Sequence, residues 1–200
     1  MTLCAKSCLL STELKVCFVS TPSPATTSAS SHDAILIAFG ANLPTQEYGA
    51  PAQTLKAALQ RLARDGDISI EQVSSFYETA PVPISDQPWY VNGVARISTG
   101  LSAHDLLERL HEDEAEFGRV RRERNAARVI DLDLIAYGRD LLREEGGIQV
   151  PHPRMAERAF VLLPLRDVAS GWVHPVLDRT VEDLIADLPA DQQIRKQAES

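Results

Sequence analysis

The chain carries little positive charge: 20 Lys and Arg residues stand against 28 Asp and Glu residues, which gives a formal net charge of −8. Proteins that bind nucleic acids without sequence preference usually have a broad basic surface, so this balance argues against that class. The arginines between residues 119 and 128 are therefore a local exception in an acidic protein.

The signatures of membrane, secreted and zinc proteins are also absent. No apolar run reaches the length of about 18 residues that predicts a membrane span, and Glu13 and Lys15 interrupt the apolar stretch that a signal peptide needs. The cysteines are Cys4, Cys8 and Cys17, an odd number without zinc-ligand spacing. We therefore expect a cytoplasmic protein with free thiols.

The glycine-rich nucleotide loops are missing as well. Neither G-x-x-x-x-G-K-[ST] nor G-x-G-x-x-G occurs in the sequence, so the common nucleotide-binding folds receive no support. A kinase without such a loop must hold a triphosphate with metal ions and dispersed Arg and His side chains.

The most informative segment present is residues 118–133, GRVRRERNAARVIDLD, in which five arginines lead into two aspartates. Alternate side chains of a strand share a face, so Asp131 and Asp133 project together while Leu132 points into the core. Carboxylates and substrate phosphates are the usual ligands of Mg²⁺, and guanidinium groups bind phosphate oxygens bidentately. The segment predicts a phosphate and magnesium site.

The alternative is a group of surface ion pairs, each contributing about 0–1 kcal/mol. The aspartates interrupt the apolar run VIDLDLIAY, and acidic residues weaken a strand. Their presence inside such a run favours the functional interpretation.

The chain divides into three parts. Residues 1–33 lack apolar periodicity and end in a stretch rich in Ser, Thr, Ala and Pro, which predicts a disordered or wrongly assigned leader. Residues 34–190 are expected to form one domain, and residues 191–200 a flexible tail.

Within the domain, hydrophobic periodicity predicts elements in the order βαββαβ. Strands are expected at 34–39, 68–77, 90–98 and 129–137, and helices at 54–64 and 102–117, the second opening with the capping pair Ser102 and Asp105. This order is typical of the ferredoxin-like sandwich, an α+β fold with one antiparallel sheet and helices across one face. Additional C-terminal helices fit residues 154–168 and 180–188.

Five blocks, taken in order, resemble the 6-hydroxymethyl-7,8-dihydropterin pyrophosphokinase family. They are GANL at 40–43, VSSFYETAPV at 73–82, DQPWYVNGV at 86–94, GRVRRER through DLDLI at 118–135, and VPHPRMAERAFVLLPL at 150–165. The resemblance implies transfer of pyrophosphate from ATP to a pterin alcohol, giving AMP and the pterin diphosphate, a step of folate biosynthesis. ATP and the pterin would be the partners, with two Mg²⁺ ions as cofactor, and we expect a monomer.

The resemblance also assigns roles position by position. It implies that Arg119 and Arg128 are catalytic and that Asp131 and Asp133 bind the metal ions. The implied ATP-binding residues are His111, Glu114, Arg121, His152 and Arg158. The implied pterin-binding residues are Thr79, Pro81, Val82, Tyr90, Asn92 and Phe160.

Plainer interpretations exist for several of these residues. A histidine at the start of a helix, such as His152, is often held by its own backbone. Arg158 and Glu114 fit solvated helix faces, and any single aromatic residue fits core packing. Without the resemblance these interpretations would be preferred for His152 and Arg158.

The chain departs from the family pattern at some positions. Asn125-Ala126-Ala127-Arg128 stands where the family usually has a Trp followed by a small residue, Pro and Arg, and the loop is one residue shorter. Gly93 stands where alanine is usual. These changes leave open a divergent paralogue of low activity that acts on another pterin.

An RNA-binding module is a third hypothesis, because the ferredoxin-like sheet also serves RNA recognition. That function needs exposed aromatic residues on a central strand. The strand at 129–137 offers aspartates instead, which would repel phosphate unless a metal ion intervenes.

Overall fold

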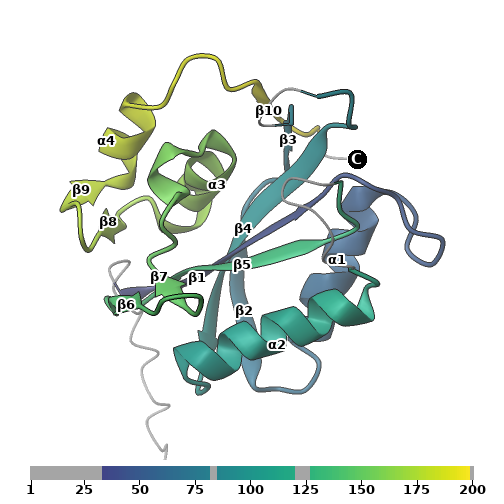
Figure 1. Cartoon of the computed structure of the whole chain (residues 1–200), viewed down its shortest axis with the longest axis horizontal. Coiled ribbons are helices and arrows are strands. Elements are labelled where there is room, and N and C mark those ends of the chain that lie inside the picture. The colour runs from purple at the N-terminus through teal and green to yellow at the C-terminus, as the bar shows by residue number, and fades with distance from the viewer. Residues whose placement is uncertain (1–32, 82–84, 120–126, 199–200) are drawn as a thin grey trace, which may run out of the picture.

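The computed structural model describes residues 33–81, 85–119 and 127–198. The first half contains β1 (Ile35–Ala41), α1 (Pro51–Leu62), β2 (Ile68–Val73), β3 (Tyr77–Thr79), β4 (Tyr90–Thr99), α2 (Ala103–Glu116) and β5 (Asp131–Tyr137) (Figure 1). It continues with β6 (Leu142–Arg143), β7 (Gln149–Val150), the 3-10 turn η2 (Met155–Glu157), α3 (Ala159–Ala169), β8 (Val173–His174), β9 (Arg179–Thr180), α4 (Val181–Ala186) and β10 (Ile194–Lys196).

One antiparallel sheet organises the domain. Its strand order is β10-β3-β4-β1-β5, with β2 also paired to β4. The small pairs β6–β7 and β8–β9 lie outside it. The predicted βαββαβ order and the antiparallel α+β sandwich are confirmed, because β1, β4 and β5 appear in the expected order with α1 and α2 between the strands.

The predicted strand 68–77 is divided into β2 and β3. At the break, Ser74 N donates to Val94 O at 2.9 Å, and the Ser74 hydroxyl accepts from Val94 N at 3.0 Å. Ser75 N donates to the Asp167 carboxylate at 3.2 Å. The Ser74 hydroxyl and the Asp167 carboxylate thus accept backbone hydrogen bonds at the break, in place of backbone oxygens of a paired strand. The alternation of apolar residues in the sequence does not reveal such a change of acceptor.

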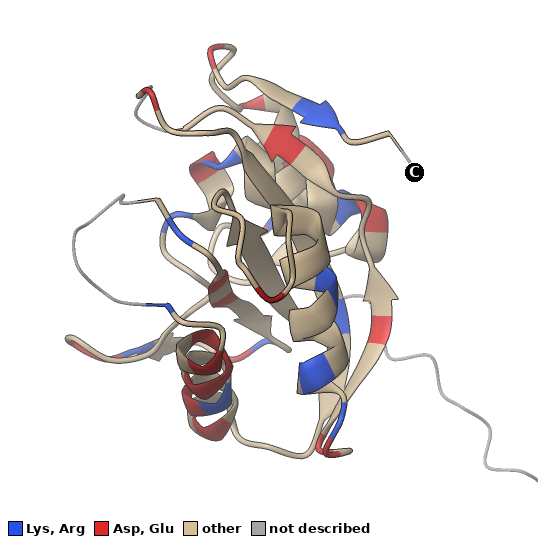
Figure 2. Ribbon diagram, turned by 90° about the vertical axis from the view of Figure 1, so that its right-hand side faces the viewer, with Lys and Arg blue, Asp and Glu red and all other residues tan. Residues whose placement is uncertain are grey.

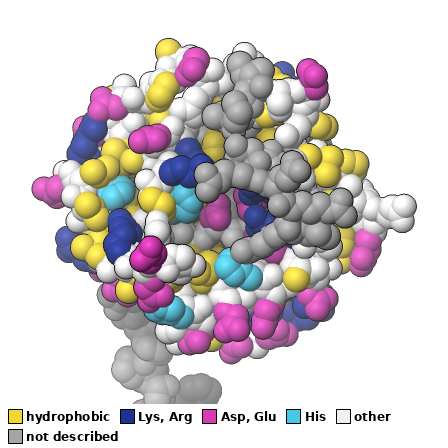
Figure 3. All heavy atoms as spheres, in the orientation of Figure 1, with side chains coloured by type: hydrophobic (Ala, Val, Ile, Leu, Met, Phe, Trp, Pro, Cys, Tyr) yellow, Lys and Arg dark blue, Asp and Glu magenta, His cyan; other side chains and the backbone are white. Residues whose placement is uncertain are grey.

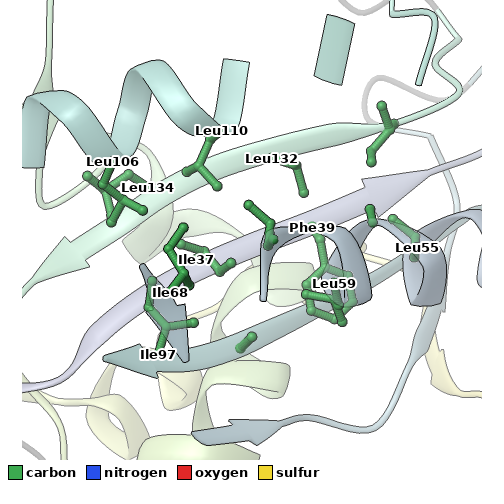
Figure 4. Packing of buried hydrophobic residues seen from close by; sticks show 14 of the residues in the cluster. Ile37, Phe39, Leu55, Leu59, Ile68, Ile97, Leu106, Leu110, Leu132 and Leu134 are labelled. Carbon is green, nitrogen blue, oxygen red and sulfur yellow. The ribbon is translucent and has the colours of Figure 1, made fainter. Parts of the chain in front are cut away.

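Both faces of the sheet are covered by helices. α1 and α2 pack against one face, where Ile37, Phe39 and Leu132 are buried (Figure 4). α3 packs against the other face, over Leu36 and Val94. α1 and α2 thus cover one face, as expected, and α3 is one of the additional C-terminal helices. It covers the second face, because neighbouring residues of β1 are apolar and buried on opposite faces, so each face needs cover.

The helix expected at 154–168 is interrupted. η2 ends at Glu157 and α3 begins at Ala159, while Arg158 between them has an extended conformation with φ −115° and ψ 109°. The predicted cap Ser102 is confirmed, since its hydroxyl accepts from Asp105 N. α4 likewise begins with a capping box, as its sequence predicts.

The C-terminal segment differs from its prediction. The sequence predicts a flexible tail at 191–200, but Ile194–Lys196 form β10 and pair with β3. That assignment is wrong for this part, because an edge strand is held by backbone hydrogen bonds that need no apolar side-chain pattern. Residues 199–200, like the predicted leader up to residue 32, lie outside the described residues.

Among the described residues, no helix combines the length and the apolar character that crossing a membrane requires.

Gly93 allows a close contact inside the sheet. It pairs with Phe39 across β1 and β4, and a Cβ atom on Gly93 would lie 2.3 Å from the Phe39 ring. The ring of this chain therefore fills the space that a methyl group at residue 93 would occupy, which explains the departure from the usual alanine.

Gly93→Ala should lower the free energy of unfolding by about 1–3 kcal/mol, because the buried ring has little room to move. Gly100→Ala is the matched control at the end of β4, where no atom lies within 4 Å of the added Cβ. Urea unfolding of both variants measures the difference. Equal effects would contradict the packing argument.

Candidate active site

A cavity of about 250 Å³ lies on the α3 face of the sheet, beside β5. Its walls come from well-separated parts of the chain and comprise Gly40, Thr79, Ala80, Pro81, Ser85, Gln87, Tyr90, Asn92, Arg119, Arg128, Asp131, Asp133, His152, Arg154, Arg158 and Phe160. Figure 3 shows basic and histidine side chains around a recess, with acidic side chains visible inside it. The fold thus brings together eleven of the fifteen predicted site residues.

Gly40 keeps the two ends of this cavity connected. It pairs with Asn92 of β4 on one side and with Asp131 of β5 on the other. A Cβ atom on Gly40 would lie 2.6 Å from Asn92 Oδ1. Because no side chain fills this position, an amide and a carboxylate on the two strands that flank β1 face the same open space.

Asp131 and Asp133 form the acidic part of the cavity. Both line it, while Leu132 between them is 1% exposed and packs in the core of the opposite face. The predicted alternation along this strand is therefore confirmed. Two carboxylates on one strand face present oxygen donors to the same volume.

Two arginines hold the Asp131 carboxylate. Arg119 Nη1 lies 2.7 Å from Asp131 Oδ1, and Arg128 Nη1 pairs with Asp131 Oδ2. Arg119 also pairs with Glu114. Each Asp131 oxygen therefore has a guanidinium partner, and both predicted catalytic arginines meet the predicted metal ligand.

Opposing electrostatic effects act on the Asp131 carboxyl group. Burial and then the charge of Asp133 raise the pKa of Asp131, whereas Arg119 and Arg128 act in the opposite direction. Additional positive charge in the cavity would stabilise the ionised form of the pair.

The donor set fits magnesium. Among the described residues, no group of three or more His, Cys, Asp and Glu side chains could hold a metal ion. Two carboxylates are nevertheless sufficient where substrate phosphates complete the coordination. Asp131 and Asp133 would hold the ion, and the arginines now bound to Asp131 would then have to share or release its oxygens.

His152 and Arg158 form another part of the cavity wall, near the aspartates. His152 Nδ1 accepts from Arg154 N at 3.2 Å, so in the neutral ring Nε2 carries the proton and can donate to a phosphate oxygen. Burial, with Arg158 and Arg154 nearby, lowers the pKa of His152 to about 4. His152 is thus held by the backbone, as its plain interpretation predicts, and it also lines the cavity.

The surroundings of Arg158 favour the binding of an anion. Burial and the nearby Arg154 lower its pKa, whereas Asp133 and Asp131 favour its charged form. Its guanidinium also lies 5.2 Å from the centre of the Phe160 ring. Like charges at Arg154 and Arg158 repel each other until negative charge enters the cavity.

The part of the cavity beside Thr79 and Asn92 suits a flat polar ligand. Asn92 Nδ2 donates to Thr79 Oγ1 at 2.8 Å, and both residues are buried. Tyr90 and Phe160 supply aromatic rings. An amide of fixed orientation beside aromatic rings can bind the edge and the face of a heterocycle.

A second cavity of about 360 Å³ adjoins the first, since Asp133 and His152 line both. His111 of α2 and the residues Gly146 to Val150 form its other walls. His111 thus lines a cavity that Asp133 and His152 share with the first one, but it does not line the cavity of Asn92.

Glu114 lies under the site. α2 carries many acidic residues (Figure 2), and Glu114 is 2% exposed and lines neither cavity. Its carboxylate accepts from Leu132 N at 2.7 Å. It therefore satisfies the backbone of the edge strand between the two aspartates and pairs with Arg119. Arg121 and Val82, also predicted site residues, lie outside the described residues.

Asn42 is a residue to which the sequence assigned no role. It is 1% exposed, and its Oδ1 accepts from Arg128 N at 2.8 Å while its Nδ2 donates to Pro88 O at 3.1 Å. Asn42 N also donates to Arg128 O at 3.0 Å. One buried amide thus ties the backbone of Arg128 to the loop before Tyr90. The block GANL was the available signal.

Gln87 and Arg154 also line the cavity without having been predicted. Gln87 Oε1 accepts from the Tyr90 hydroxyl at 3.1 Å. Each belongs to a sequence block that carries the family resemblance, but their residue types alone gave no sign of a role.

Comparison with known proteins identifies the family. The sequence model described as 7,8-dihydro-6-hydroxymethylpterin-pyrophosphokinase (HPPK) matches residues 36–170. The chain belongs to this family. It is 41% identical over 139 residues to a 2-amino-4-hydroxy-6-hydroxymethyldihydropteridine pyrophosphokinase of Haemophilus influenzae, which covers 70% of this chain and 83% of that protein.

Some other relatives are longer proteins. Folic acid synthesis protein FOL1 of Dictyostelium discoideum is 36% identical over 162 residues, 81% of this chain but 23% of that protein. Among solved structures, wild-type HPPK-DHPS of Plasmodium falciparum has a TM-score of 0.56 at 12% identity, over 76% of this chain and 44% of that chain. At this identity the likeness shows the fold alone. The chain spans less than half the length of these two proteins.

His152 should make stability depend on pH. Its pKa is about 4 in the folded protein and about 6.5 in an unfolded chain. Between these values the unfolded chain binds the proton and the folded one does not, so stability falls as the pH falls. His152→Asn, which keeps an acceptor for Arg154 N, should lose less stability between pH 7 and pH 4 than the wild type.

The measurement is urea unfolding at several pH values. Burial also lowers the pKa of His174, but that contribution is present in both proteins and cancels in the comparison. Identical pH profiles for the two proteins would show that the ring of His152 is protonated normally.

Proposed function

We propose that this protein transfers pyrophosphate from ATP to the hydroxymethyl group of 6-hydroxymethyl-7,8-dihydropterin, giving AMP and the pterin diphosphate in folate biosynthesis. The observation that carries the proposal is the shared cavity in which Asp131 and Asp133 face the arginines and His152. Membership of the family and the identity with pyrophosphokinases of similar length support it.

The two substrates fit different ends of the site. The heterocycle of the pterin would lie between Tyr90 and Phe160 with its polar edge on Asn92, which Thr79 orients. Pro81, which also lines this end, would contribute the loop that closes it. The phosphates would lie between the aspartates and the wall formed by His152 and Arg158.

The second cavity would take the nucleoside of ATP. It joins the phosphate end through Asp133 and His152 and reaches His111. A ligand that occupied both cavities would pass beside Asp131 and Asp133. ATP would have to lie in this way for its β-phosphorus to face the pterin.

In the reaction, the pterin hydroxyl oxygen attacks the β-phosphorus and loses its proton to water. The bond from that phosphorus to the oxygen bridging to the α-phosphorus breaks, and AMP leaves. Two Mg²⁺ ions on Asp131 and Asp133 would neutralise phosphate charge and align the reacting groups. Arg119 and Arg128, released from Asp131, would bind the oxygens on which charge develops. His152 would donate from Nε2 to a phosphate oxygen, and Arg158 would add a fixed positive charge.

Glu114 would act on ATP binding through Arg119 and the strand of the aspartates, since it is buried beneath them. We include a monomeric state and a cytoplasmic location in the proposal, on the basis of the sequence. RNA binding is disfavoured, because α3 covers the sheet face that would have to stack bases.

The test is mass spectrometry of products formed from ATP, Mg²⁺ and 6-hydroxymethyl-7,8-dihydropterin. AMP and the pterin diphosphate are expected in equal amounts. Asp131→Asn and Asp133→Asn should remain folded and lose at least about 99% of the activity, because the amide keeps the shape but not the charge. Asp140→Asn, at an exposed aspartate after β5, should be fully active.

Absence of product with the wild type would refute the proposed function. Near-normal turnover of either aspartate variant would refute the metal assignment alone. The proposed substrates and reaction would still hold, because the products would still form.

Arg128→Ala should slow the chemical step about 10³-fold and change pterin affinity little, because the lost charge is needed chiefly in the transition state. Single-turnover kinetics separate the two quantities. The exposed Arg139→Ala is the control. Weakened pterin binding with an unchanged chemical rate would instead place Arg128 in the pterin pocket.

A further inference from the structure

One side chain from the C-terminal segment holds the backbone on both sides of Arg158. Gln192 Nε2 donates to Glu157 O at 2.8 Å, and Gln192 Oε1 accepts from Ala159 N at 2.9 Å. Both partners are immediate neighbours of Arg158. A single primary amide therefore spans the break between η2 and α3.

The break needs such a partner. Arg158 is the N-cap residue of α3, and its side chain makes no capping hydrogen bond. The first amides of a helix have no partner inside the helix. Gln192 supplies an acceptor for the first of these amides, Ala159 N. The side chain of residue 158 remains available for the cavity.

Gln192 is itself anchored to the opposite wall of the cavity. Directly after it, Gln193 O accepts from Ala80 N at 3.1 Å, and β10 then pairs with β3. Arg195 adds an ion pair of 2.6 Å with Glu78. Figure 1 shows the chain passing from α4 across to β10 beside β3.

The segment therefore connects the two walls of the site. Thr79 and Ala80 line the end with the aromatic rings, and Arg158 lines the phosphate end. A shift of β10 relative to β3 would move Gln192 and, with it, the backbone of Arg158.

We propose that Gln192 is a positioning residue that fixes the phosphate-binding guanidinium of Arg158 by clamping the backbone on both sides of it. The inference rests on the proposed function for the role of Arg158 toward ATP. It adds a residue to which no role has been given, in a segment whose sequence predicts no part in the site.

The clamp is needed because of the charges around Arg158. Its guanidinium lies near Arg154 and over the Phe160 ring, in a largely desolvated position. Repulsion from Arg154 favours any movement that separates the two guanidinium groups. Fixing the backbone restricts that movement, and small displacements of a charged contact weaken phosphate binding strongly.

The test compares Gln192→Met with Gln193→Met. Methionine has nearly the length of glutamine but can neither donate nor accept these hydrogen bonds. Gln193 is the exposed neighbour of the same residue type. Its hydrogen bond to Ala80 is made by its backbone oxygen, so the substitution leaves that bond in place. The measurement is the affinity for a non-hydrolysable ATP analogue with Mg²⁺, by calorimetry, alongside urea unfolding and product formation by the wild type.

Gln192→Met should bind the analogue about tenfold more weakly, as expected for two lost hydrogen bonds and a displaced charge. Gln193→Met should bind it as the wild type does. Gln192→Asn should also weaken binding of the analogue, because its amide is one methylene too short to reach both partners. It is the variant to use if Gln192→Met does not fold.

A double-mutant cycle separates positioning from a general structural role. In an Arg158→Ala background, Gln192→Met should weaken analogue binding by less than about twofold, because the group that it positions is gone. An undiminished tenfold effect in that background, or no effect in the wild-type background, would overturn the inference. If the wild type neither binds the analogue nor forms the pterin diphosphate, the proposed function fails, and the inference fails with it.

Discussion

The site depends on the contact between the Asp131 carboxylate and two guanidinium groups at the edge of the sheet. Asp131 lies beside a second carboxylate, and burial and that neighbour raise its pKa. Such a pair is tolerated only where positive charge is close. Arg119 and Arg128 supply that charge, and in doing so they are held where a triphosphate and its metal ions would meet them.

The second requirement is that helices cover both faces of the sheet. α1 and α2 form the larger core, and α3 forms a second one over Leu36 and Val94. Because α3 lies across the same face as Asp131, its start brings Arg158 and Phe160 over the cavity. Packing that buries apolar surface thus also sets the distance between the acidic strand and the basic wall.

Side-chain amides then connect loops that the core alone would leave free. Asn42 binds the backbone of Arg128 and the loop before Tyr90. Gln192 binds the backbone on both sides of Arg158. Each amide has a donor and an acceptor, so one side chain can fix two segments at once. The backbones of Arg128 and Arg158 are therefore held by neutral amide side chains that do not line the cavity.

The sequence by itself determined the order of the elements, the antiparallel sheet, the shared face of Asp131 and Asp133, and most of the residues around the cavity. The first three follow from periodicity and capping residues, which are local properties of the chain. The residues around the cavity were implied by the resemblance of five sequence blocks to a known family. Only the tertiary structure decided that α3 covers the second face, that Ser74 divides a strand, and that β10 joins the sheet. It also decided that Glu114 lies beneath the site and that Asn42 and Gln192 clamp it, because hydrogen bonds between residues distant in sequence leave no periodic pattern by which they could be predicted.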